Sequence, residues 1–261
     1  MGARAIWSGK IRFEKLELPV KLYSAVEDRG VHFRLLHDKD RQPVHQTMVN
    51  SKTGQEVPKE RVRKGVEVEP GAFVLIGETD AERLEPEASR EIEIERFVDP
   101  DEIGHQWYDR PYYLGPAEGD DQAYWNFVEA LQRSGKEGVA RWVMRKKPYV
   151  GALRIENGHL MLITLHFDQE VILAEDLEPP PGRELDKKEL AMAGELVKAM
   201  ADRFEPEKFR DEFRNRVMEL VEAKAKGRKL KLVKPEKKAG RSSLAGALQA
   251  SIAAARKAKH A

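Results

Sequence analysis

The chain has 261 residues, 41% of them hydrophobic and 35% charged, which predicts a folded protein of one large domain or of one domain with appendages. It contains no cysteine, so disulfides and thiolate metal sites are excluded. Because no apolar stretch approaches the roughly 18 residues of a membrane helix, and Met1–Trp7 has no secretory pattern, we expect a cytoplasmic protein without a membrane span.

Charge is distributed unevenly, although the formal total is only +1. Residues 223–261 contain twelve Lys and Arg and a single acidic residue, Glu236, so their net charge is +11. Residues 1–222 therefore hold 34 Lys and Arg against 44 Asp and Glu, a net charge of −10. An acidic body with a strongly basic end predicts an electrostatic partner, such as nucleic acid or an acidic protein surface.

The first 180 residues have mainly the pattern of β-strands. Residues 7–13 alternate, with Trp7, Ile11 and Phe13 on one face, and residues 91–95 alternate Glu with Ile. Asn157-Gly158 predicts a type I′ turn between strands at 149–156 and 159–166. Because both faces of that hairpin are largely apolar, we expect it to be central in its sheet.

Two helices are expected among these strands. One begins at Asp120 or Asp121 and ends at Gly135, because Tyr124, Phe127, Val128 and Leu131 form an i, i+3, i+4, i+7 stripe. A shorter one is expected to start at Thr79, which forms a capping box with Glu82. Many strands and few helices indicate a barrel or a sandwich.

Two groups of basic residues occur within the acidic body. Residues 32–66 carry a net charge of +4 and few large apolar side chains, so this segment is expected to project from the barrel. The second group lies on and after a predicted strand around residues 140–145, in which Arg141, Val143 and Arg145 share a face. Each group alone suits a solvated surface equally well, but both together favour contacts to phosphate groups, which need no sequence readout. The candidate DNA-binding residues are Arg34, Lys39, Arg41, Lys52, Lys59, Arg61, Arg63, Lys64, Arg141, Arg145, Lys146 and Lys147.

The chain changes character at the proline-rich linker 178–182. Asp186 is expected to cap a helix that carries Leu190, Gly194, Val197, Met200 and Phe204 on one stripe. A second helix is expected to begin at Pro206, with four apolar side chains pointing inward: Phe209, Phe213, Val217 and Leu220.

The last segment is predicted to be a flexible polycation followed by a short helix. Nine of the eighteen residues 224–241 are Lys or Arg, and we expect this stretch to be disordered when free. Ser243 is the expected cap of the final helix, whose apolar stripe either docks in a groove of a partner or is a solvated, alanine-rich end. The candidate contact residues of this tail are Lys229, Lys231, Lys234, Lys237, Lys238, Leu244, Leu248 and Ile252.

The sequence contains no convincing catalytic motif. Walker, G-x-G-x-x-G, H-E-x-x-H and G-x-S-x-G patterns are missing, and the seven His are scattered, which argues against a metal-dependent nuclease or phosphodiesterase. Glu91, Glu93 and Glu95 are better interpreted as a solvated outer strand face than as metal ligands. We therefore predict a protein that is not an enzyme and has no metal site and no cofactor.

Several stretches match a known family in order and at the expected spacing. They are 4–9 (RAIWSG), 18–25 (LPVKLYSA), 89–94 (SREIEI) with Phe97-Val98, 112–114 (YYL), and Met200-Ala201 through Phe204-x-Pro206 to the region 220–224. The match spans nearly the whole chain, which in these motifs resembles the bacterial form of Ku, the DNA-end-binding protein of non-homologous end joining.

The resemblance implies an α+β protein with a Ku core, a SPOC-like β-barrel, over residues 1–182. It implies a DNA-encircling bridge inserted at 32–66, a helical arm over 183–224 that embraces a second subunit, and a basic flexible tail with a short terminal helix over 225–261. Two copies are expected to form a ring-shaped homodimer that threads onto double-stranded DNA ends at the nucleoid. The tail is expected to contact DNA and to help recruit and stimulate the multidomain end-joining DNA ligase. General compaction of nucleic acid or RNA binding, without end specificity, is the alternative.

The sequence departs from the family pattern at two places. Asn50-Ser51-Lys52-Thr53-Gly54 stands where many relatives carry Cys-x-x-Cys-Gly, so a metal knuckle is ruled out in the bridge. Glu14 stands where relatives usually have Gly, so the first turn is expected to differ.

Overall fold

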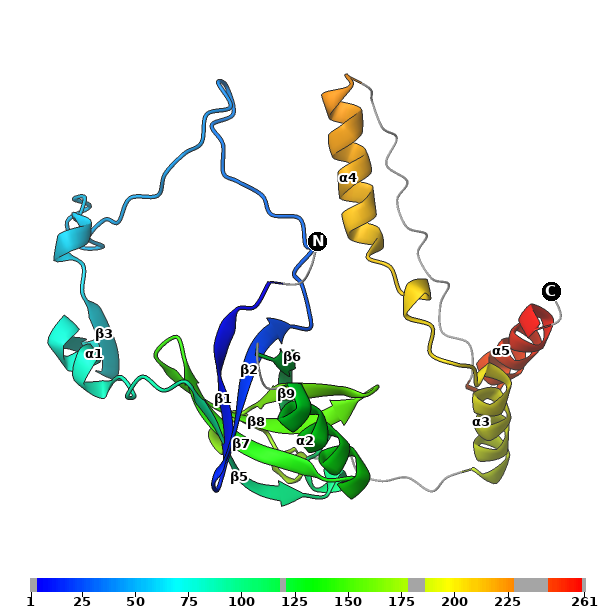
Figure 1. The fold of residues 1–261 in the computed structure, drawn as a ribbon. Coiled ribbons are helices and arrows are strands. Elements are labelled where there is room, and N and C mark those ends of the chain that lie inside the picture. The colour runs from blue at the N-terminus through cyan, green and yellow to red at the C-terminus, as the bar shows by residue number, and fades with distance from the viewer. Residues whose placement is uncertain (1–3, 118–120, 178–185, 228–243, 260–261) are drawn as a thin grey trace. The chain divides into compact units, whose positions relative to one another are not determined.

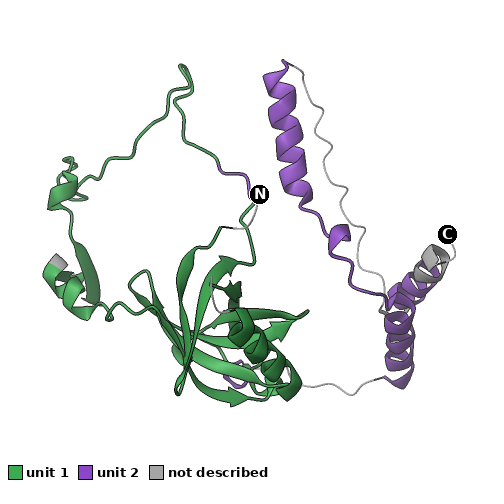
Figure 2. Ribbon diagram, viewed as in Figure 1, with its two compact units in different colours: residues 1–29, 33–174 green, residues 30–32, 175–261 purple. Residues whose placement is uncertain are grey.

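The computed structural model describes residues 4–117, 121–177, 186–227 and 244–259. It divides into two units, which are coloured separately in Figure 2. The first comprises 1–29 and 33–174, and the second comprises 30–32 and 175–261.

Seven strands of the first unit close into a barrel in the order β1-β2-β6-β9-β8-β7-β5 (Figure 1). All neighbours are antiparallel except β1 and β5, whose parallel pairing closes the barrel. This confirms the β-barrel core of the expected α+β fold. The strands are β1 (Trp7–Phe13), β2 (Leu16–Ser24), β5 (Glu91–Val98), β6 (Tyr108–Pro116), β7 (Glu137–Met144), β8 (Lys147–Glu156) and β9 (His159–Leu165).

The core is built from the inward positions of these strands and from one helix. Ile11, Ile92 and Leu153 are at most 1% exposed, as the alternating pattern of their strands predicts. Helix α2 (Asp121–Ser134) buries Tyr124, Val128 and Leu131 against the same core and ends before Gly135, so the predicted helix is confirmed.

The hairpin β8–β9 turns at Asn157-Gly158, whose φ angles of 51° and 77° are those of a type I′ turn, as predicted. It lies between β7 and β6, and Leu160 and Leu162 are completely buried. The expected central position of this hairpin is therefore confirmed.

A second tight turn, between β7 and β8, was not predicted. Met144 pairs with Lys147, so Arg145 and Lys146 are the two turn residues, with φ angles of 53° and 64°. The expectation that Arg145 continues the strand face of Arg141 and Val143 is therefore wrong.

Between β2 and β5 the chain makes a long excursion outside the barrel, residues 25–90, which we call the insertion. The segment 32–66 that was expected to project lies within it. The insertion has little regular structure apart from η1 (Lys59–Arg61), β3 (Lys64–Glu69) paired with β4 (Ala72–Ile76), and α1 (Glu78–Leu84). Helix α1 begins one residue before Thr79, and the Asp80 carboxylate, not Glu82, accepts a hydrogen bond from the preceding backbone, at Gly77 N (3.1 Å).

The second unit consists of helices α3 (Lys187–Met200), α4 (Glu212–Ala225) and α5 (Leu244–Lys259), with a 3-10 turn at Pro206–Lys208. Asp186 caps α3 as predicted, since it accepts hydrogen bonds from Lys188 N and Glu189 N. Pro206 begins only the 3-10 turn, because α4 starts at Glu212 under the cap of Asp211. The linker 178–182 and the expected cap Ser243 lie outside the described residues.

The apolar stripes of this unit are arranged differently from the expectation. Helix α3 packs against α5, and Leu248 and Ile252 are half-buried there. The expected α3 stripe is exposed, with Val197 at 69%, and Phe209 and Phe213 are 73% and 64% exposed. Phe209 and Phe213 therefore do not point inward within the described part of the chain, whereas Val217 and Leu220, expected on the same face, are half-buried.

Candidate nucleic-acid interface

Eight of the candidate phosphate-binding residues lie on the insertion. All eight are exposed, and among the described residues none of them forms a salt bridge with a carboxylate. A surface cation without a carboxylate partner can contact a phosphate without first breaking an ion pair. They are Arg34, Lys39, Arg41, Lys52, Lys59, Arg61, Arg63 and Lys64.

A tight loop presents Lys39 and Arg41. Its base is fixed by backbone hydrogen bonds from His37 N to Gln42 O (2.9 Å) and from Arg41 N to His37 O (3.0 Å). The Asp40 carboxylate accepts a hydrogen bond from Gln42 N (3.1 Å) and lies 2.8 Å from His37 Nδ1. Both contacts lower the pKa of the Asp40 carboxyl, and the bond from Gln42 N contributes most. Asp40 is therefore engaged within the loop, and the other carboxylate of the loop, Asp38, lies 3.6 Å from His37 Nε2, so neither pairs with Lys39 or Arg41.

A second loop, Asn50–Gly54, presents Lys52. The Asn50 side-chain oxygen accepts from Lys52 N (2.9 Å) and Thr53 N (3.2 Å), and Gly54 N donates to Asn50 O (2.8 Å). Gly54 has a φ of +67°, the left-handed conformation that glycine adopts most readily. An Asx turn thus closes the loop and holds Lys52 in it.

The remaining cations of the insertion surround η1 and the start of β3. The Arg63 guanidinium donates to the carbonyl oxygens of Glu60 (2.6 Å) and Val62 (3.0 Å), which directs the side chain along the backbone and leaves its charge unneutralised. Lys64 is the first residue of β3 and is exposed.

The barrel contrasts with the insertion because several cations on the outer faces of β1 and β7 are paired with carboxylates of neighbouring strands. Lys10 bridges Glu17 (2.7 Å) and Glu91 (3.1 Å), and Arg12 bridges Glu91 (2.9 Å) and Glu93 (2.6 Å). These bonds raise the pKa of Lys10, and the bond to Glu17 is the main cause. They also lower the pKa of Glu91, and there the bond from Lys10 is the main cause. The acidic ladder on β5 is therefore an outer strand face, as predicted, and its carboxylates are ion-paired with neighbouring cations.

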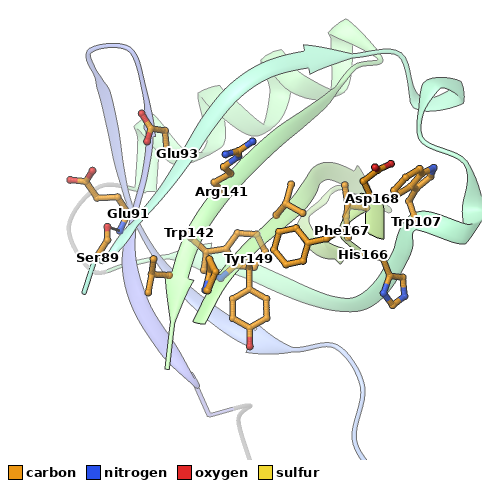
Figure 3. A pocket seen from close by; sticks show the side chains of 14 residues that line it. Ser89, Glu91, Glu93, Trp107, Arg141, Trp142, Tyr149, His166, Phe167 and Asp168 are labelled. Atoms are coloured by element: carbon orange, nitrogen blue, oxygen red, sulfur yellow. Dashed lines mark hydrogen bonds between the residues drawn. The ribbon is translucent and has the colours of Figure 1, made fainter. Parts of the chain in front are cut away.

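The second group of candidate residues is divided between two environments. Arg141 lies on β7 and bonds Glu95 at 2.9 Å, and it lines a hollow of about 660 Å³ together with Glu91, Glu93 and Asp168 (Figure 3). The wall of this hollow is aromatic, with Trp142 and Tyr149 stacked 5.4 Å apart. Arg145 and Lys146 lie in the β7–β8 turn, and Lys147 follows them at the start of β8.

The tail residues are only partly described. Lys229, Lys231, Lys234, Lys237 and Lys238 lie outside the described residues, whereas Leu244, Leu248 and Ile252 belong to α5. Over the described part of the chain, no group of three or more His, Asp or Glu side chains could hold a metal ion. No helix described here is long and apolar enough to cross a membrane.

Sequence reasoning missed four residues near the turn: Ser8, Glu85, Ser89 and Arg90. Lys146 Nζ lies 2.8 Å from a Glu85 carboxylate oxygen, which raises the pKa of Lys146. Ser8, Ser89 and Arg90 line a hollow with Arg145 and Lys146. Ser8, Ser89 and Arg90 lie in the stretches 4–9 and 89–94 that carry the resemblance, whereas Glu85 had no sequence signal.

The fold and its charges together define a β-barrel protein with C-terminal helices and a long insertion, whose segment 32–66 has a net charge of +4. The model of the Ku70/Ku80 beta-barrel domain matches residues 12–192, more than half of the chain. The chain therefore belongs to the Ku family.

Similar proteins cover most of the chain. The non-homologous end joining protein Ku 1 of Geotalea uraniireducens (strain Rf4) is 38% identical over 226 residues, which cover 87% of this chain and 86% of that protein. The non-homologous end joining protein Ku of Anaeromyxobacter sp. (strain K) is 38% identical over 257 residues, which cover 98% of this chain and 87% of that protein. The protein of the same name from Archaeoglobus fulgidus is 33% identical over 255 residues, which cover 96% of this chain and 99% of that protein.

Proposed function

We propose that this protein acts in the repair of double-strand breaks by non-homologous end joining. In this role it binds double-stranded DNA ends without reading sequence, as a ring-shaped homodimer associated with the nucleoid, and it recruits and stimulates the multidomain end-joining DNA ligase. Its part is binding and not catalysis. The names of the relatives, non-homologous end joining protein Ku, support the pathway.

The observation that carries the proposal is the set of eight unpaired cations on the insertion. Lys and Arg side chains that meet phosphates supply affinity for any sequence, because every nucleotide carries the same phosphate. A ring of two insertions lined in this way would hold a duplex by its backbone and would admit it only from a free end.

The exposed apolar side chains of the second unit support a second copy of the chain as partner. Phe204 and Phe209 stack with ring centroids 5.4 Å apart, yet they are 79% and 73% exposed in the single chain. Monomeric soluble proteins rarely expose neighbouring aromatic side chains to this degree. A symmetric dimer would bury this cluster twice.

The test compares binding of one plasmid in relaxed closed and in singly cut form, over a series of salt concentrations. End binding predicts that only the cut plasmid competes for the protein. If about eight phosphates are contacted, log K falls against log salt with a slope near −7. Equal competition by the closed circle, or by single strands and RNA, would instead identify a general nucleic-acid binder, and a slope shallower than about −2 would contradict the phosphate contacts.

The role of the tail is tested separately, by changing Lys229, Lys231, Lys234, Lys237 and Lys238 to Gln. These substitutions leave α5 and its packing on α3 in place, which a truncation at residue 224 would not. We expect end binding to persist and ligase stimulation to fall. Loss of end binding with unchanged stimulation would reverse this division of labour.

A further inference from the structure

The β7–β8 turn uses residues that are unfavourable for its backbone. Arg145 and Lys146 both adopt left-handed φ angles, 53° and 64°, which side chains with a Cβ rarely adopt. The next turn along the chain, between β8 and β9, also has two left-handed residues, and it uses Asn157-Gly158, the pair that a type I′ turn prefers. Local strain of this kind is frequent at functional sites, which makes the surroundings of this turn a place to look for one.

The turn borders a hollow of about 510 Å³ that is rich in cations and hydroxyl groups. Its polar lining consists of Ser8, Ser89, Arg90, Arg145 and Lys146. Three segments meet there: the start of β1, the end of the insertion just before β5, and the β7–β8 turn.

The position of Arg90 in this hollow is fixed by the backbone. Lys10 N donates to Arg90 O (2.9 Å) as β5 joins β1. A Cβ at Gly9 would collide with that carbonyl oxygen and with the Trp7 indole ring, so only glycine permits this approach. Arg90 is thus held beside the turn by barrel closure.

The cations of the hollow differ in how they are paired. Lys146 bonds Glu85, a residue that does not line the hollow. Arg90 and Arg145 are exposed, and neither has a carboxylate partner within the described residues. Two guanidinium groups, a positioned ammonium and two hydroxyls are all hydrogen-bond donors, and a phosphate oxygen is the acceptor that such a set suits best.

The aromatic hollow of Figure 3 does not offer these properties. Three carboxylates, Glu91, Glu93 and Asp168, line it, and its one cation, Arg141, is already bonded to Glu95. The two hollows of the same barrel therefore differ in charge, and only the one at the turn suits an anion.

We propose that the hollow formed by Arg90, Arg145, Lys146, Ser8 and Ser89 binds a phosphodiester group of the DNA backbone. This inference deepens the proposed function and rests on it. It adds a fixed contact on the barrel to those on the insertion, at the point where the insertion rejoins the barrel. Arg90 and Arg145 bind the phosphate oxygens directly, and Glu85 positions Lys146 beside them.

The test is the double variant Arg145→Asn, Lys146→Gly, which gives this turn the residues of the β8–β9 turn. Because the substitutions remove backbone strain, the urea midpoint of the barrel should rise, although an exposed ion pair worth little is lost. DNA affinity should fall about eightfold per lost phosphate contact at 0.1 M salt, and the salt slope should shrink by about 0.9 per contact. Stability and binding thus move in opposite directions, which a misfolded variant cannot mimic.

Two further variants complete the test. Arg90→Gln leaves the turn unchanged and should reproduce the loss of affinity. The control Lys15→Gln, Arg96→Gln also removes two exposed cations, but at the opposite end of the barrel, where Phe13 contacts Phe97, and should change affinity less than about twofold.

The outcomes separate this inference from the proposed function. A wild-type slope near −7 that neither the turn variant nor Arg90→Gln alters would overturn the phosphate site and leave DNA binding intact. A shallow wild-type slope would refute the proposed function itself. An equal loss of DNA affinity in the control variant would show that only net charge matters. Displacement of the duplex by millimolar inorganic phosphate at constant ionic strength would instead assign the hollow to free phosphate.

Discussion

Tyr124 offers a sharp test of how α2 is held on the barrel. Its side chain is 3% exposed, and its hydroxyl donates a hydrogen bond to Leu114 O on β6 (2.6 Å). Burial raises the pKa of Tyr124 from 10.0 to about 12, because the phenolate would have to form away from water. The perturbation we consider is Tyr124→Phe, which keeps the ring and removes the ionisable group.

The expected effect changes sign with pH. At neutral pH the variant should be less stable by about 1 kcal/mol, the usual value of a buried hydrogen bond. Since the folded pKa is raised, the tyrosine hydroxyl stabilises the fold fully below pH 10, and this contribution is lost as pH rises from 10 toward 12. Two pKa units correspond to about 2.7 kcal/mol, so the variant should become the more stable protein at a pH between about 10 and 11.

The assay is urea unfolding of the full chain at intervals from pH 8 to pH 11.5, followed by tryptophan fluorescence. All four tryptophans, Trp7, Trp107, Trp125 and Trp142, lie in the barrel unit, so the signal reports that unit alone. Tyr108 also has its pKa raised to about 12, by burial and by its bond to Glu137, but it titrates equally in both proteins. Parallel stability curves over this pH range would refute the reasoning.

Two other predictions follow from single positions. Glu14 has a left-handed φ of 51° in the β1–β2 turn, so Glu14→Gly should stabilise the barrel by about 1 kcal/mol in the same urea assay, and an unchanged midpoint would show that the turn is unstrained. Phe209→Asp should weaken the proposed dimer at least about 100-fold in sedimentation equilibrium, because each of the two buried side chains would lose about 1.5–3 kcal/mol of burial free energy. The control Ile172→Asp, at a side chain with the same 73% exposure, should leave the dimer unchanged.

The barrel was predictable because its signals are local. Alternation placed β1 and β5, the apolar stripe of Tyr124, Val128 and Leu131 placed α2, and Asn157-Gly158 placed the hairpin β8–β9. Each of these patterns carries its own period or turn chemistry within a few residues. The closure of the sheet by parallel pairing of β1 with β5 is a contact across about 80 residues and leaves no such trace.

The errors also have physical causes. Arg145-Lys146 lacks the glycine or asparagine by which a type I′ turn is recognised, so the strand pattern was extended through it. The pattern of an amphipathic helix predicts that its apolar face is buried, but it does not say whether the same chain or another chain covers that face. Phe209 and Phe213 were therefore assigned inward positions, although both are exposed in the single chain. The hollow at Arg90 joins three segments distant in sequence, which no spacing rule relates.

The distribution of ion pairs decides what the charge imbalance means for DNA. A net charge of −10 over residues 1–222 suggests that the body repels a polyanion, yet Lys10, Arg12 and Arg141 each use a carboxylate of the barrel. At physiological salt, exposed charges interact over only about 8 Å, so a phosphate responds to the side chains beside it and not to the total. Under the proposed function, the attractive surface of the first unit would therefore be the cations without a carboxylate partner, on the insertion and at Arg145 of the β7–β8 turn, and the carboxylates on the outer strands would disfavour contact elsewhere. Replacing barrel carboxylates should accordingly increase binding to closed circles more than binding to ends.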